Sequence, residues 1–135
     1  MELADTSAWT NRAKSVQTDE DFSARLLADE IATCPIVVME LLWTTQEAHE
    51  FAEFRADLRS LSQIALTGEV WDRAMDVWHE LARLGRHRQV KIPDLLVAAA
   101  AEGAEVGVCH YDADFDVIAR VTGQPVRAIA PLGSL

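Results

Sequence analysis

Four segments of the sequence place a carboxylate at the edge of an apolar run. In chain order these acids are Asp5, Glu40, Asp94 and Asp112. If the apolar runs pack into one core, the acids meet at its rim, where a pair of like charges ~4 Å apart costs about 4 kcal/mol at an effective dielectric of ~20. A protein that gathers such groups protonates some of them or binds a divalent cation. We expect a cation, and therefore a metal-dependent hydrolase.

The identity of the cation follows from the available ligands. Mg²⁺ is a hard cation that takes carboxylate oxygens and water and keeps positions open for phosphate, and Mn²⁺ is expected to substitute for it. A soft zinc site is not predicted, because the two cysteines are far apart and the histidines are dispersed. The histidines are His49, His79, His87 and His110.

The chain has 135 residues, which is the size of one ordinary domain, so we expect a single domain over residues 1–135. Its net charge of −10 argues against a common nucleic-acid-binding protein, whose surface is basic. The charge does not exclude an enzyme that meets phosphate through metal ions bound to its acids.

No apolar run approaches the ~20 residues of a membrane span, and the first five residues do not resemble a secretory leader. Cys34 and Cys109 lie in apolar segments, which predicts two buried thiols in a reducing cytoplasm. We therefore expect a cytoplasmic protein with no membrane contact.

Short β-like runs alternate with amphipathic helices along the chain. We expect strands ending at Asp5 and over residues 61–66, 106–110 and 126–129. Helices are expected from a capping box at Thr18 and Asp21 to about Ile31, from Pro35, from about Glu50, over residues 68–84, over residues 93–102 with a stop at Gly103, and over residues 114–121. This order predicts an α/β fold with a mostly parallel central sheet between two helical layers, and sites in such folds gather at the carboxyl ends of the strands.

Four motifs, taken in this order and spacing, resemble the PIN-domain ribonucleases, and among these the VapC toxins of bacterial toxin–antitoxin pairs. The motifs span residues 5–9 (DTSAW), 35–42 (PIVVMELL), 93–100 (PDLLVAAA) and 112–119 (DADFDVIA). The resemblance implies a three-layer PIN-like fold, a homodimer or a toxin–antitoxin hetero-oligomer, and two partners: an RNA substrate and a VapB-type antitoxin.

The resemblance also implies a metal site formed by Asp5, Glu40, Asp94 and Asp112, with Asp114 as a fifth carboxylate. These residues would serve metal-activated hydrolysis of RNA phosphodiester bonds, leaving 5′-phosphate and 3′-hydroxyl ends. Asp116 has a weaker claim, because three acids spaced two apart cannot all point from a helix into one crevice.

Three residues beside the acids are candidate substrate contacts. Ser7 is expected to orient Asp5 or a water molecule, since no histidine marks it as a nucleophile. Trp9 either packs in the core or stacks on an RNA base. His110 occupies a position where the family often has Thr, Ser or Asn, so an imidazole there replaces that contact or meets the substrate.

A basic segment precedes Asp94. It contains Arg83, Arg86, Arg88 and Lys91. Cations near the end of a helix interact favourably with its last carbonyl groups, which accounts for Arg83 and extends at most to Arg86. The part beyond Gly85 is alternatively a loop that holds RNA phosphates, and we assign Arg86 and Arg88 to this role.

Other functions share parts of this pattern. Each acid alone could cap a helix or lie on the surface. A catalytically degenerate PIN-like domain would serve as an interaction or regulatory module, but it would not be expected to keep all four acids. A phosphatase of the haloacid dehalogenase type needs a second Asp where Ser7 stands, and a related metal-dependent DNA nuclease usually needs longer insertions.

Overall fold

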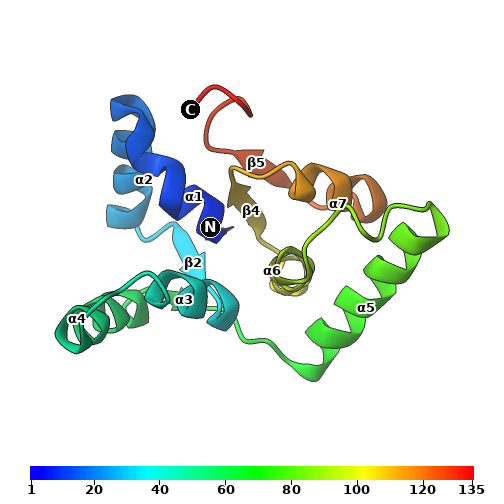
Figure 1. The fold of residues 1–135 in the computed structure, drawn as a ribbon, viewed down its shortest axis with the longest axis horizontal. Helices are drawn as coiled ribbons and strands as arrows, with labels where there is room; N and C mark the ends of the chain where they lie inside the picture. Colours follow the sequence, from blue (N-terminus) through cyan, green and yellow to red (C-terminus); the bar gives the residue numbers. More distant parts are fainter.

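A computed structural model describes residues 1–135, and its centre is a five-stranded sheet (Figure 1). The strands are β1 (Glu2–Ala4), β2 (Ile31–Thr33), β3 (Ser62–Gln63), β4 (Gly107–His110) and β5 (Val126–Ala128). Their order is β3-β2-β1-β4-β5, and every neighbouring pair is parallel. The predicted parallel sheet is therefore confirmed, and it is parallel throughout.

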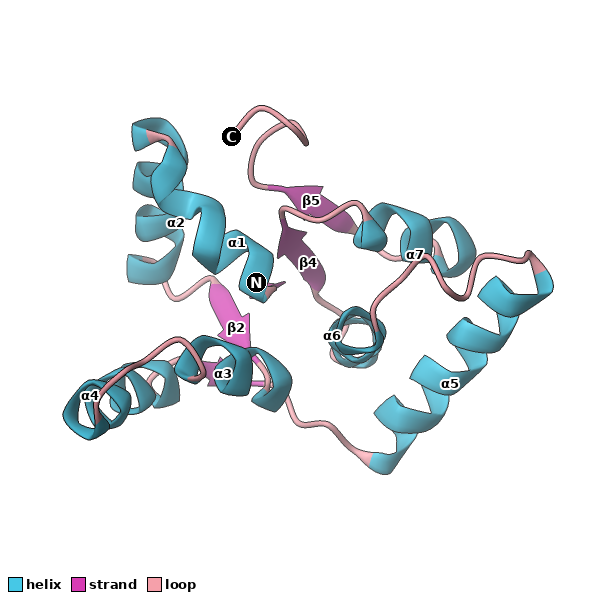
Figure 2. Ribbon diagram, in the orientation of Figure 1, coloured by secondary structure: helices cyan, strands magenta, loops and turns pink.

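Helices cover both faces of the sheet (Figure 2). They are α1 (Thr6–Asn11), the short 3-10 helix η1 (Arg12–Lys14), α2 (Val16–Leu27), α3 (Pro35–Leu42), α4 (Ala48–Arg59), α5 (Gly68–Arg83), α6 (Ile92–Gly103) and α7 (Asp114–Thr122). Helices α1 and α2 lie on one side of the row of strands, and α5, α6 and α7 lie on the other (Figure 1). The fold is the three-layer α/β/α arrangement predicted from the sequence.

Alternation along the strands divides the interior into two cores. Leu3 and Val108 join the larger core, which α3 to α7 complete, whereas their neighbours Ala4 and Cys109 join a smaller core with Phe22 of α2. Successive side chains of a strand point to opposite faces, so both faces of β1 and β4 are buried. These strands form a rigid base for whatever follows them.

The chain leaves β1 and β4 in opposite directions. Strand β1 leads to α1 over the smaller core, and β4 leads to α7 over the larger core. Neighbouring parallel strands whose connections diverge in this way open a crevice at their carboxyl ends, which is the usual place for a ligand in an open α/β sheet. Asp5 and Asp112 follow these two strands.

Three predicted boundaries are wrong. The capping box at Thr18 and Asp21 does not begin a helix, because α2 starts at Val16 and its cap is Ser15, whose side chain accepts from the backbone N–H of Thr18. The same prediction carried the helix through Ile31 and so missed β2. At the end of α6, Glu105 takes the left-handed conformation, with a φ of 57°, in the place predicted for Gly103.

Other predictions agree with the structure. Both cysteines are buried and unpaired, as expected. None of the helices combines the length and apolar composition that a membrane crossing requires.

Candidate metal and RNA site

Asp5 occupies the junction between β1 and α1. Its backbone N–H donates to the Cys109 carbonyl at 2.9 Å, which ties the end of β1 to β4. Its carboxylate Oδ2 accepts from the backbone N–H of Ser7 at 2.9 Å and from the Ser7 hydroxyl at 2.6 Å. Asp5 is therefore the N-cap of α1, and the predicted contact with Ser7 is present. The capping role and a place in the crevice are compatible, because only one carboxylate oxygen is used.

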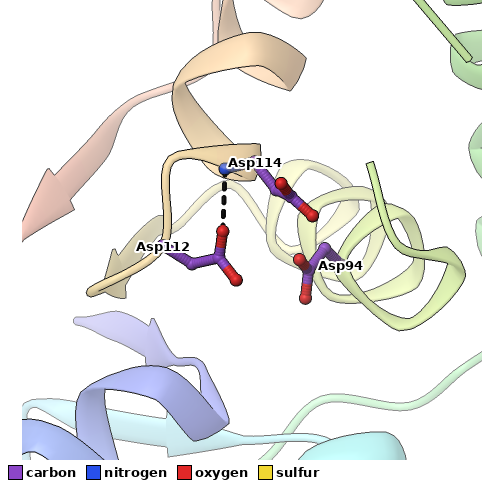
Figure 3. Close-up of side chains that lie close together, drawn as sticks. All are labelled: Asp94, Asp112 and Asp114. Atoms are coloured by element: carbon purple, nitrogen blue, oxygen red, sulfur yellow. Dashed lines mark hydrogen bonds between the residues drawn. The ribbon is translucent and has the colours of Figure 1, made fainter. Parts of the chain in front are cut away.

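Asp112 and Asp114 follow β4 at the start of α7. The Asp112 Oδ1 atom accepts from the backbone N–H of Asp114 at 2.9 Å, which closes a tight turn (Figure 3). Asp114 Oδ2 in turn accepts from the backbone N–H of Lys91 at 2.9 Å. This contact joins the first residue of α7 to the cap of α6, so the two helices present their acids to the same space.

Asp94 is the third residue of α6 and is only 5 % exposed. Its Oδ2 atom is buried and has no hydrogen-bond partner. The nearest cation is the Lys91 ammonium, 3.4 Å away. A buried carboxylate oxygen without a hydrogen bond is costly, and such a group calls for a proton or a cation.

One carboxylate oxygen from each of Asp94, Asp112 and Asp114 lies within 4.8 Å of the other two. The three side chains converge from α6, from the turn after β4 and from the first residue of α7 (Figure 3). Oxygen ligands at this spacing suit a hard divalent cation and give no soft ligand to a thiophilic metal. The Asp94 oxygen that accepts no hydrogen bond is the atom that such an ion would coordinate.

The pKa values of two of the acids, Asp94 and Asp5, are raised. Burial raises the pKa of Asp94, a hydrogen-bonding interaction with Asp114 and the charges of Asp5 and Asp112 raise it further, and the Lys91 ammonium opposes the rise. Burial also raises the pKa of Asp5, against the hydrogen bonds from Ser7. Both shifts show that negative charge on these two carboxyl groups is disfavoured when no cation is present.

Glu40 lies apart from this cluster. It is the sixth residue of α3, and its side chain is exposed. The hydroxyl of Thr6 donates to Glu40 Oε1 at 2.9 Å, so the carboxylate is held beside the first turn of α1. Asp5 and Glu40 both raise the pKa of the Cys34 thiol, after its burial, which places the two acids around the start of α3.

The His110 side chain is completely buried, which contradicts the prediction that it contacts RNA. Its Nδ1 atom accepts from the backbone N–H of Asp112 at 3.1 Å, and its ring packs 5.1 Å from that of Phe115. Burial lowers the pKa of His110, so the ring is neutral and carries its proton on Nε2. The imidazole supports the turn that presents Asp112.

The other predicted substrate contacts lie at the surface or at its edge. Trp9 packs edge-on against Phe22 at a ring distance of 5.0 Å and stays half-buried. Arg86 donates to Gln89 at 3.0 Å, while Arg88 is exposed and forms no ion pair. Their contact with RNA remains a prediction.

Lys91 differs most from the sequence-based interpretation. We placed it in a loop that binds phosphate, whereas it caps α6 and its ammonium donates to Asp112 Oδ2 at 2.8 Å and to Asp114 Oδ2 at 2.9 Å. Burial opposes the charge, but the bonds to these two acids raise the pKa of Lys91 above its ordinary value. The only sign of these contacts in the sequence was the position of Lys91, three residues before Asp94.

Comparison with known proteins gives consistent matches. The PIN domain family matches residues 3–121. Ribonuclease VapC18 of Mycobacterium tuberculosis is 39% identical over 133 residues, which cover 97% of this chain and 96% of the relative. Ribonuclease VapC51 of the same organism is 38% identical over 108 residues, covering 80% and 78%.

Solved structures share the fold. A DNA-bound VapBC structure from Salmonella typhimurium aligns with a TM-score of 0.74 at 19% identity, covering 96% of this chain and 100% of that chain. A toxin–antitoxin complex from Klebsiella pneumoniae aligns with a TM-score of 0.71 at 19% identity, covering 96% and 98%. At these identities the likeness establishes the three-layer architecture.

Proposed function

Since this chain belongs to the PIN-domain family, in its VapC ribonuclease branch, we propose that Asp5, Glu40, Asp94 and Asp112, together with Asp114, form the site at which it cleaves RNA. The protein is a metal-dependent endoribonuclease and the toxin of a toxin–antitoxin pair. Residues 1–135 act as one ribonuclease domain. The main support for the site is the convergence of three carboxylates, one of which, Asp94, has a buried oxygen that accepts no hydrogen bond.

Mg²⁺ is the proposed cofactor, and Mn²⁺ is expected to replace it. The fit rests on the donor set, which is oxygen only, and on the buried Asp94 Oδ2 that lacks a hydrogen bond. When bound, a divalent cation supplies Lewis-acid activation of water and charge stabilisation at the phosphate. Asp94, Asp112 and Asp114 would hold it.

The chain's own residues prepare the site before substrate arrives. Ser7 holds one oxygen of Asp5 and leaves the other free. Asp112 is fixed by its bond to the Asp114 N–H, and the His110 ring supports the same turn. The raised pKa of Asp94 favours a proton on this carboxyl group, and a bound cation would compete with that proton for the same oxygens.

Glu40 completes the site from the other side of the crevice. Thr6 holds its carboxylate beside α1, and Asp5 is the cap of that helix. From this exposed position Glu40 is suited to bind a water molecule or an outer ligand of the cation. RNA would enter over this exposed side, with Arg86 and Arg88 holding its phosphates and Trp9 near the entrance.

A VapB-type antitoxin is the proposed protein partner, in a hetero-oligomer or with a toxin homodimer. Large apolar side chains exposed on α3, at the residue that follows it and on α5 support this, because exposed apolar surface of this kind is a common feature of protein contact sites. They are Met39, Trp43, Trp71 and Met75. We further propose a cytoplasmic location, which fits two buried, unpaired thiols.

The decisive experiment is RNA cleavage with Mg²⁺ or Mn²⁺, with EDTA, and with Asp94→Asn. Cleavage should require the metal and fall by about a hundredfold or more in the variant, because charge stabilisation by a metal contributes several kcal/mol and ~1.4 kcal/mol is a factor of ten. Metal binding without cleavage would instead favour a degenerate PIN-like module. Cleavage in EDTA, or full activity of Asp94→Asn, would remove the proposed site.

A further inference from the structure

The Lys91 ammonium lies among the three carboxylates that would hold the metal. It is 2.8 Å from Asp112 Oδ2, 2.9 Å from Asp114 Oδ2 and 3.4 Å from Asp94 Oδ2. An ammonium group is a compact point charge with three donors, so it can neutralise several oxygens at once. In the free protein, the position suited to a cation already holds one.

We propose that Lys91 is a resident counter-ion of this cluster and that a divalent metal must displace its ammonium before it can bind. The proposal rests on the function proposed above, in that the cluster of Asp94, Asp112 and Asp114 is the metal site. A metal and the ammonium need the same oxygens, and two cations within this space repel each other. Lys91 thereby lowers the apparent metal affinity of the free enzyme.

The geometry allows the ammonium to leave without disturbing the fold. The Lys91 side chain is 62% exposed, so it is not fixed by packing. The backbone N–H of Lys91 has its own bond to Asp114 Oδ2, which keeps α6 joined to α7 whatever the side chain does. The Lys91 ammonium can therefore move away while the backbone of Lys91 stays in place.

Removal of the charge tests the proposal directly. In titration calorimetry with Mn²⁺, Lys91→Met should bind metal about tenfold more tightly than the unaltered protein, since affinity is reduced by the fraction of molecules whose site is already occupied. Lys91→Arg keeps a cation there and should stay closer to the unaltered protein. Lys14→Met is the matched control, because Lys14 is the chain's only other lysine, exposed at the end of η1 and without an ion pair.

Thermal unfolding gives a second readout that needs no activity. Without metal, Lys91→Met should lower Tm, because Asp112 and Asp114 lose their counter-ion. With saturating Mg²⁺ the difference from the unaltered protein should shrink or reverse. A lysine with a merely structural role would instead cost the same in both conditions, and that result would overturn the proposal.

Lysine NMR follows the displacement itself. With ¹³C at the ε carbons, the chain gives two lysine signals, which the two methionine variants assign. Saturation with Mg²⁺ should move the Lys91 signal and leave that of Lys14 unchanged. Metal binding with an unmoved Lys91 signal, or equal or weaker affinity in Lys91→Met, would refute the counter-ion role, whereas failure of the unaltered protein to bind metal at all would refute the proposed function beneath it.

Discussion

The backbone N–H of Tyr111 donates to the hydroxyl of Ser7 at 2.9 Å, across 104 positions of sequence. The same hydroxyl donates to Asp5 Oδ2 at 2.6 Å. One side chain thus joins the ends of β1 and β4 at the point where the connections of the sheet diverge, and it aligns Asp5 with the segment that carries Asp112. This pair of bonds holds the carboxyl ends of the two strands together.

Replacement of Ser7 by Ala should therefore affect both stability and activity. The Tyr111 N–H and Asp5 Oδ2 lose a partner in a partly buried site, so the free energy of unfolding should fall by about 1–3 kcal/mol. RNA cleavage should fall by roughly 10- to 100-fold, the usual effect of losing a group that orients a metal ligand. Denaturant unfolding and initial rates at saturating Mg²⁺ measure the two effects.

Ser60→Ala is the matched control for this change. The Ser60 hydroxyl donates to a backbone carbonyl at the exposed end of α4, remote from the acids. Its loss should leave cleavage unchanged. If Ser7→Ala behaved like Ser60→Ala in both assays, the bond between Ser7 and Asp5 would have no part in the site.

The positions of Asp5, Asp94 and Asp112 in the fold could be predicted because each follows a local feature of the sequence. Asp5 and Asp112 follow apolar runs that form strands, and Asp94 follows the proline that opens α6. Local pattern was enough to bring these residues to one edge. The Lys91 ammonium could not be placed in the same way, because its partners lie 21 and 23 residues away and nothing local distinguishes a lysine that folds back from one that faces solvent.

The missed strand has a different cause. β2 comprises only three residues, Ile31–Thr33, all buried, and a run that short shows no alternation. The preceding residues Asp29 and Glu30 continue the polar pattern of α2, so the helix was predicted to extend too far along the chain. The true end of α2 is marked by Asp29 at a φ of 58°, a conformation that is uncommon for a residue with a side chain.

Without metal, the stability of the fold should depend on pH through Asp94. Its pKa in the folded protein is raised above the ordinary value of 3.8, so the folded state holds the proton more tightly. The contribution to stability is complete below pH 3.8 and is lost as pH rises through the folded pKa. In EDTA, the free energy of unfolding of the unaltered protein should therefore fall, relative to that of Asp94→Asn, as pH rises from 3.8 to the folded pKa of Asp94.

Unfolding of both proteins at several pH values measures the effect. The two curves should diverge as pH rises, with Asp94→Asn the more stable in alkaline buffer. Parallel curves would mean that burial and neighbouring charges do not hold a proton on Asp94. With Mg²⁺ present, the unaltered protein should regain stability as pH rises, because metal binding is then no longer opposed by the proton.

His110 should give a pH dependence of the opposite sign. Burial lowers its pKa below the ordinary 6.5, so the folded state prefers the neutral ring. Its contribution to stability is present above pH 6.5 and is lost as pH falls through the folded pKa. His110→Asn removes this titration, and its Tm should approach that of the unaltered protein in acid. His79→Asn, at an exposed site on α5, is the control and should leave the dependence of Tm on pH unchanged. If His110→Asn also left it unchanged, burial of a neutral His110 ring would be excluded as the cause.

The basic segment after α5 should govern RNA affinity without affecting the metal site. Arg88 is exposed and without an ion pair, and Arg86 is held only by Gln89, so both guanidinium groups can reach phosphate. The double variant Arg86→Gln/Arg88→Gln should weaken RNA binding and reduce the slope of log affinity against log salt by about one to two, one for each phosphate contact removed. Mn²⁺ affinity should not change, because neither residue contacts the acids.

The double variant Arg55→Gln/Arg59→Gln is the control, since it removes the same charge from the exposed surface of α4. Fluorescence anisotropy with a non-cleavable RNA, measured at several salt concentrations, compares the RNA affinities of the two double variants. A general effect of lower positive charge would weaken both variants equally. Loss of affinity confined to the Arg86 and Arg88 variant would place the RNA path beside the start of α6, where Lys91 and Asp94 lie.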